Sequence, residues 1–148
     1  MSRIVVIVAF LIGFNSFAQS IDYNTKKGYV AEGYDVVAYF DNKAIPGDKA
    51  YETTYDGVKF KFSSQENLKK FIDNPSKYVP KYGGYCAYAV AVSSKKVAIN
   101  PETFEIRDGE LLLFYNSGKT NTLELWKNES PEELKVKADK NWKKIKNK

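Results

Sequence analysis

The residue best suited to chemistry in this chain is its single cysteine, Cys86. It lies in a block of small and aromatic residues that extends from Tyr82 to Val92. A cysteine thiolate is a ligand for soft or transition metal ions such as copper. The chain contains no histidine, and its one methionine is Met1. A soft metal ion at Cys86 would therefore need further soft ligands from a second chain, which a homodimer could supply.

Two other interpretations of Cys86 stay open. It can be a small buried core residue beside Ala87 and Ala89. It can also be a redox-sensitive or dimer-forming thiol, since thiol reactivity follows exposure and thiolate fraction.

The composition also excludes several kinds of active site. Without histidine the chain can form no Ser-His or Cys-His nucleophile pair, no HExxH zinc site and no imidazole general base. With one cysteine it can form no disulfide within the chain. We predict no catalytic residue and expect a binding protein rather than an enzyme.

Three tyrosines around Cys86 are candidate ligand-binding residues. Tyr82, Tyr85 and Tyr88 could line a pocket in which the rings give contact area and the phenols orient the ligand. Core packing with satisfied hydroxyls is the alternative. Asp35 is a further candidate, either as a ligand-binding carboxylate or as a residue that caps a turn.

The first 18 residues have the pattern of a secretory signal peptide. Arg3 provides a positive start, Ile4 to Phe14 form an apolar run, and Ser16-Phe17-Ala18 resembles a cleavage site. We expect cleavage near Ala18 and a periplasmic or secreted protein. The apolar run is short for a membrane span, so we expect no transmembrane segment in the mature protein.

Two Asp-Gly pairs, Asp56-Gly57 and Asp108-Gly109, each separate two strand-like stretches, and the stretches around Asp56-Gly57 alternate polar and apolar residues. This pattern predicts β-hairpins over residues 51–62 and 104–115. The continuous apolar run Val36 to Phe40 predicts a buried strand.

Helices are expected on either side of the second hairpin. Ser63 and Glu66 have the spacing of a capping box, and Asn74-Pro75 ends the helix that follows them. A second capping box, Ser130 with Glu133, precedes an amphipathic helix. Short helices are expected over residues 75–78 and 122–126, whereas residues 85–92 fit a helix or a strand.

These elements predict one α+β domain, with a small antiparallel sheet built from hairpins and helices packed on it. We place the signal peptide at residues 1–18, an N-terminal segment at 19–27 and the domain at 28–145.

Several sequence blocks follow one another in a fixed order. They are Gly33-Tyr34-Asp35-Val36-Val37-Ala38-Tyr39-Phe40, Asp56-Gly57, Phe60-Lys61-Phe62-Ser63-Ser64, Asn67, Phe71, Asn74-Pro75 and Lys77-Tyr78. Together these blocks resemble the YHS-domain family. The block Tyr82-Gly83-Gly84-Tyr85-Cys86-Ala87-Tyr88 looks like an exported bacterial subgroup, as do Ile106, Asp108-Gly109-Glu110-Leu111 and Lys137-Ala138-Asp139-Lys140-Asn141-Trp142.

The resemblance implies a relation to heavy-metal handling, because YHS domains accompany copper and other metal transport ATPases and metal binding by cysteines is the usual proposal. At the positions of those cysteines this chain has Ala38, Ser63 and Asn67. Val36 also stands where the family has a proline. The resemblance therefore implies the fold more securely than the metal site.

The net charge of +5 and the lysine-rich C-terminal segment raise the question of a nucleic-acid partner. Glu132, Glu133 and Asp139 interrupt the positive charge, so we interpret this segment as a solvated face and expect no nucleic acid. We predict an exported, non-catalytic YHS-type module that binds a metal ion at Cys86, or a small ligand. The alternatives are a redox-sensitive or dimer-forming single-thiol protein and a tyrosine-rich envelope interaction protein.

Overall fold

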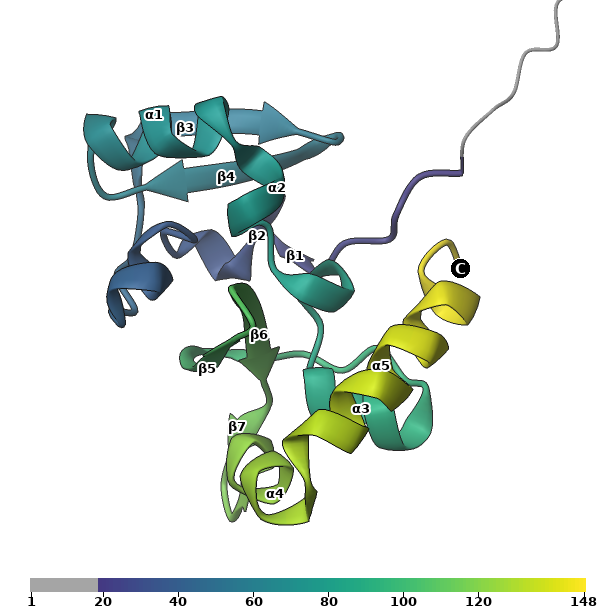
Figure 1. The fold of residues 1–148 in the computed structure, drawn as a ribbon. Helices are drawn as coiled ribbons and strands as arrows, with labels where there is room; N and C mark the ends of the chain where they lie inside the picture. The colour runs from purple at the N-terminus through teal and green to yellow at the C-terminus, as the bar shows by residue number, and fades with distance from the viewer. Residues whose placement is uncertain (1–18) are drawn as a thin grey trace, which may run out of the picture.

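The computed structural model describes residues 19–148, so the predicted signal peptide lies outside the described residues. Figure 1 shows β3 and β4 with α1 at one end of the molecule and helices α3 to α5 at the other. The elements in chain order are β1 (Thr25–Lys26), β2 (Tyr29–Val30), η1 (Ala31–Gly33), η2 (Ala38–Asp41), β3 (Asp48–Tyr55), β4 (Val58–Phe62), α1 (Gln65–Asp73), α2 (Pro75–Tyr78), η3 (Lys81–Gly84), α3 (Ala87–Ser93), β5 (Asn100–Arg107), β6 (Glu110–Phe114), β7 (Asn116–Ser117), β8 (Thr120–Asn121), α4 (Thr122–Glu129) and α5 (Pro131–Ile145).

The larger sheet has four strands in the order β1-β2-β4-β3. Its main hairpin, β3–β4, turns at Asp56-Gly57 as predicted, and both turn residues have positive φ, 51° and 80°. Such a turn matches the right-handed twist of the strands. The strand β2 lies parallel to β4 through the pair Tyr29–Lys59, and the other pairs are antiparallel. The helix α1 buries Leu68 and Phe71 in the core that contains Phe60 and Phe62 of β4.

The second predicted hairpin, β5–β6, is also confirmed, and β6 separates two clusters of core side chains. Leu111 and Leu113 belong to the cluster under the four-stranded sheet, whereas Leu112 and Phe114 belong to the cluster formed with α3, α4 and α5. Successive side chains of a strand point to opposite faces. All four are fully buried, so β6 packs against both parts of an α+β domain.

The buried strand predicted over residues 36–40 is wrong. Val36 and Val37 lie in a turn, and the 3-10 helix η2 follows. The reason is Asp35, whose carboxylate oxygen Oδ1 accepts hydrogen bonds from the backbone N–H groups of Val37 and Ala38. A side chain that bonds its own neighbouring backbone competes with strand pairing.

The capping box predicted at Ser63 is shifted by one residue. Ser64 is the N-cap of α1, and its hydroxyl accepts from the backbone N–H of Asn67 at 3.1 Å. The Ser63 hydroxyl instead donates to Asp35 at 2.7 Å. The capping box predicted at Ser130 does not form, because the Ser130 side chain makes no capping hydrogen bond. The helix α5 nevertheless begins at Pro131, as expected.

The other helices agree with the sequence. The helix α1 ends at Asp73 before Asn74-Pro75, the short helix α2 follows, and α4 includes the residues expected from 122. Residues 85–92 fitted a helix or a strand. Most of α3 lies in this stretch, and Cys86, just before α3, forms an isolated bridge with Leu113.

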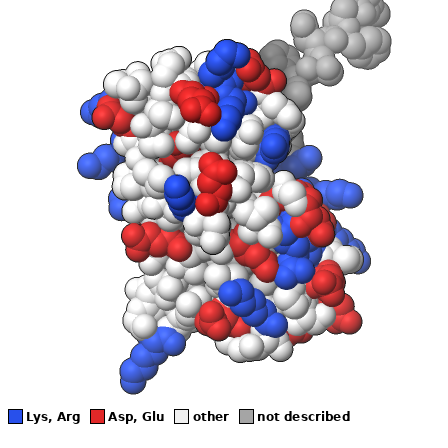
Figure 2. Space-filling model, turned by 60° about the vertical axis from the view of Figure 1, so that its left-hand side comes forward, with Lys and Arg blue, Asp and Glu red and all other residues white. Residues whose placement is uncertain are grey.

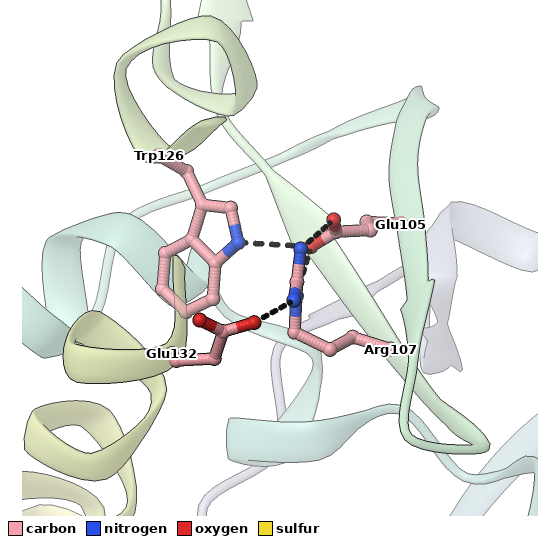
Figure 3. Close-up of polar contacts among 4 residues, drawn as sticks. All are labelled: Glu105, Arg107, Trp126 and Glu132. Atoms are coloured by element: carbon pink, nitrogen blue, oxygen red, sulfur yellow. Dashed lines mark hydrogen bonds and ion pairs between the residues drawn. The ribbon is translucent and has the colours of Figure 1, made fainter. Parts of the chain in front are cut away.

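A partly buried polar network joins β5 to α4 and α5 (Figure 3). The Glu105 carboxylate accepts two hydrogen bonds from the Arg107 guanidinium, at 2.7 and 3.1 Å, and one from the Trp126 indole at 2.8 Å. Trp126 is fully buried. The other side of the guanidinium meets Glu132 at 3.4 Å. Glu105 therefore holds the indole that fills the core between α4 and the sheet.

We expect Glu105→Ala to lower the free energy of unfolding by about 2 kcal/mol, because it leaves the buried indole N–H without its acceptor and removes two hydrogen bonds of the Arg107 guanidinium. The measurement is urea unfolding at neutral pH. Glu132→Ala is the matched control. Its side chain is 86% exposed, so we expect a change of less than about 0.5 kcal/mol. Equal losses in the two variants would contradict this assignment.

Candidate functional site

Asp35 is a buried hydrogen-bond centre. Its side chain is fully buried, and five donors of the chain surround its two oxygens. While Oδ1 accepts from Val37 and Ala38, Oδ2 accepts from the Ser63 N–H and hydroxyl and from the Asn67 amide, at 2.7 to 2.8 Å. These contacts join the η2 turn to the start of α1. The geometry fits the turn-capping interpretation, and it leaves the carboxylate no exposed oxygen for a ligand.

Cys86 is also fully buried, at the start of α3. Its Sγ lies 3.3 Å from the Thr122 hydroxyl, which itself donates to the Tyr115 carbonyl at 2.7 Å. Its backbone N–H donates to the carbonyl of Val97. The thiol therefore sits beside the first residue of α4, in the interior of the domain.

The three predicted tyrosines have different environments. Tyr82 is buried and donates to Asp139 of α5 at 2.9 Å; burial and this bond raise its pKa well above the ordinary value. Tyr85 packs on Trp142, and burial together with Asp22 raises its pKa to about 12. Tyr88 is partly buried against both core clusters. Each of these rings contributes to packing, and Tyr82 also lines the cleft described below.

The backbone at Tyr82-Gly83-Gly84 is left-handed at three successive residues, with φ of 57°, 61° and 81°. A buried tyrosine in this region is unusual and must be held by its surroundings. At Gly83 an added Cβ would lie 2.9 Å from the Trp142 ring and 3.0 Å from the Asp22 carbonyl. The glycine pair thus allows α5 and the N-terminal segment to approach η3 closely, which is the tight-turn interpretation of this motif.

This close approach forms an open cleft of about 280 Å³, which we call the aromatic cleft. Its walls come from the N-terminal segment, the β3–β4 turn, the α2–η3 connection and α5. The aromatic and charged side chains that line it are Tyr23, Tyr55, Tyr82, Trp142, Asp56 and Lys81. A mostly apolar concave surface with a few polar groups is typical of small-ligand sites.

The polar groups of the aromatic cleft have defined partners. The Tyr23 hydroxyl donates to Asp56 Oδ2 at 2.7 Å, and burial and this carboxylate raise the pKa of Tyr23, so the phenol remains a donor at neutral pH. Lys81 is paired with Glu110 at 3.0 Å. The other carboxylate oxygen of Asp56 accepts no hydrogen bond within residues 19–148, so it is available to a ligand.

Of the predicted ligand-binding residues, the structure brings only Tyr82 into this cleft. Sequence reasoning missed Tyr23, Tyr55, Asp56 and Trp142, which come from three distant parts of the chain. The high tyrosine content indicated that aromatic side chains could line a binding site. It did not indicate which of these side chains lie next to one another.

A soft metal ion does not fit the contacts of Cys86. Among residues 19–148 no three His, Cys, Asp or Glu side chains are grouped so that they could hold a metal ion. The groups next to the thiol are a threonine hydroxyl and backbone, which are poor ligands for a soft ion.

No helix in the described part of the chain has the length and apolar character needed to cross a membrane. No curated protein and no solved structure matches the chain. A family model does match: residues 36–82, from the turn after Asp35 through β3, β4, α1 and α2 to Tyr82, match the YHS domain. The match ends before Tyr85, Cys86 and Tyr88. Residues 36–82, less than half of the chain, are therefore the part that is similar to the YHS domain.

Proposed function

We propose that this chain is a non-catalytic binding module whose aromatic cleft holds a small organic ligand. The observation that supports this most is that four aromatic side chains and one carboxylate, from four separate parts of the sequence, meet around the left-handed backbone turn at residues 82–84. Backbone strain of this kind concentrates at ligand sites. The volume of about 280 Å³ lies just below the usual range for ligand pockets, so it suits a small ligand with one ring.

The cleft chemistry suggests an aromatic or alkyl amine. Rings of Tyr and Trp attract cations and pack on flat apolar groups. The same rings already lie near the chain's own ammonium groups, with Lys96 Nζ 5.9 Å from the Trp142 ring centre and Lys81 Nζ 5.8 Å from that of Tyr82. The Asp56 carboxylate can accept a hydrogen bond from the amino group. The charge of Lys81, which would repel a cation, is offset by Glu110.

The test is a calorimetric titration with phenethylamine and, in parallel, with its neutral counterpart phenethyl alcohol. We expect saturable binding of the amine and an affinity about fivefold lower for Asp56→Asn, which removes the charge that faces the cation.

Asp108→Asn is the matched control for this titration. Asp108 has the same place in the Asp-Gly turn of the second hairpin, with φ of 53° against 51° for Asp56, and it lies outside the cleft. Its amine affinity should equal that of the wild type. Absence of amine binding in the wild type, or the same loss in both variants, would refute the proposal.

We also propose that the module is exported, on the sequence pattern of residues 1–18. The test is the mass of the protein recovered from the producing cells. Cleavage after Ala18 gives a chain that begins at Gln19, whereas a full-length mass in the mature protein would contradict export by this route.

A relation to heavy metals is proposed only at the level of the YHS match. The structure gives it no site at Cys86, and the aromatic cleft contains no soft ligand. Binding of Cu(I) in one-to-one ratio by the wild type, lost in Cys86→Ser, would restore the metal interpretation and require the region around α3 and α4 to open.

A further inference from the structure

Five lysines line a second hollow, away from the aromatic cleft. This lysine pocket has a volume of about 550 Å³ and is lined by Lys26, Lys27, Lys49, Lys59, Lys61, Tyr29, Tyr34 and Glu32. The side chains come from the β1–β2 hairpin, η1, β3 and β4. Because strands distant in sequence meet in one sheet, lysines more than 30 positions apart share one concavity.

The charges of the lysine pocket are poorly balanced. The acidic residue in its lining, Glu32, lies 3.8 Å from Lys26. Within residues 19–148 the other four lysines form no ion pair. Glu52 stands nearby on β3, and the Tyr29 hydroxyl donates to it. The lining therefore carries a net charge of about +4, and mutual repulsion of the ammonium groups opposes folding there.

Two of the lysines are held in place. Lys59 and Lys61 have their Nζ atoms 5.7 and 4.2 Å from the centre of the same Tyr29 ring. The stem of Lys61 passes over Gly33, where an added Cβ would lie 2.8 Å from its Cε. Gly33 has φ of +81° and ends a segment in which Ala31 and Glu32 are also left-handed. The backbone of η1 is thus shaped to leave room for a lysine that points into the pocket.

This concentration of charge is local. On the face of the molecule shown in Figure 2, basic and acidic side chains are interspersed, with no large region of one sign. Although the chain has a net charge of +5, that face does not form a continuous basic surface. A hollow with four unpaired ammonium groups instead favours one compact anion that carries several charges.

We propose that the lysine pocket binds a phosphate-bearing polyanion, either free in solution or at the surface of a lipid bilayer. Lysine ammonium groups bind phosphate as point charges and need no fixed bidentate geometry. A polyphosphate offers several charged oxygens within the span of the pocket, whereas a monocarboxylate could neutralise only one lysine. The proposal is independent of the aromatic cleft, since the two sites share no lining residue.

The first experiment is a titration of the protein with inorganic tripolyphosphate at low ionic strength, by calorimetry and by the shift in melting temperature. A ligand that binds only the folded state raises that temperature. The test variant is Lys49→Gln with Lys59→Gln, two exposed lysines whose loss leaves the core intact. We expect its affinity to fall about tenfold or more.

The matched control is Lys143→Gln with Lys144→Gln. These residues are exposed on the last turn of α5, outside the pocket, and their loss changes the net charge equally. Its affinity should stay within about twofold of the wild type. An equal loss in the two double variants would overturn the proposal, because it would show general attraction to a basic protein.

The second arm distinguishes the source of the phosphate. Sedimentation with vesicles of phosphatidylcholine and phosphatidylglycerol is compared with vesicles of phosphatidylcholine alone. Binding to the anionic vesicles that depends on Lys49 and Lys59, without tripolyphosphate binding, assigns the pocket to a lipid phosphate. Tripolyphosphate binding without vesicle binding assigns it to a free polyanion. Saturable binding in neither arm overturns the proposal.

Discussion

Replacing Asp35 with alanine is expected to lower the free energy of unfolding by about 4 kcal/mol, the largest effect of any single polar substitution proposed for this chain. The carboxylate accepts five hydrogen bonds in a fully buried position. Alanine would leave these donors without a partner, and each buried unsatisfied group costs about 1–3 kcal/mol before water or local relaxation compensates. Since a domain is stable by only about 5–15 kcal/mol, much of the stability would be lost.

The measurement is urea unfolding followed by circular dichroism. Asp41→Ala is the control, because Asp41 is an acidic residue of the adjacent η2 helix that is exposed. We expect it to change the stability by less than about 0.5 kcal/mol. Asp35→Asn should lie between the two, because it keeps one acceptor oxygen but turns an amide donor toward other donors. If Asp35→Ala were as stable as the wild type, the carboxylate would not be the structural centre we describe, and its ligand-binding interpretation would gain support.

Cys86 is expected to react with iodoacetamide about 10³-fold more slowly in the folded protein than in urea. The thiol is fully buried beside Thr122, so alkylation must wait for local or global opening of the domain. Opening of a buried core site costs several kcal/mol, and about 4 kcal/mol corresponds to this factor. The measurement is the rate of mass increase under native conditions and in denaturant.

The control for this experiment is Ser117→Cys in a Cys86→Ser background. Ser117 is exposed on β7, so its cysteine should react within about tenfold of the unfolded rate. If the native Cys86 reacted as fast as this exposed thiol, the redox-sensitive or dimer-forming interpretation would become the leading one. A protected Cys86 would instead favour the interpretation as a small core residue.

The hairpins and most of the helices were predictable because their signals are local. An Asp-Gly pair between two strand-like stretches favours a turn with positive φ at both residues, and both pairs form that turn. The stop of α1 at Asn74-Pro75 follows from the geometry of proline alone. Such elements depend on neighbours within a few positions, which the sequence displays directly.

Two of the wrong predictions concern the hydrogen bonds of one residue, Asp35. Val36 to Phe40 has the composition of a buried strand, and Ser63 has the spacing of a capping residue. The structure instead uses Asp35 to bond the backbone of its own turn and the Ser63 hydroxyl 28 positions away. A hydrophobic run can be buried as a strand or as a turn followed by a 3-10 helix. The hydrophobic pattern alone therefore could not distinguish these two structures.

The α+β class and the two hairpins follow from sequence patterns, and the single cysteine and the lack of histidine follow from composition. The contacts that these residues make depend on the tertiary structure. It places Cys86 in the core, makes Asp35 a hydrogen-bond centre, and assembles the aromatic cleft and the lysine pocket from segments distant in the chain. The physical reason is that turns and helix ends follow from local backbone preferences, whereas a concave site depends on how several elements pack together.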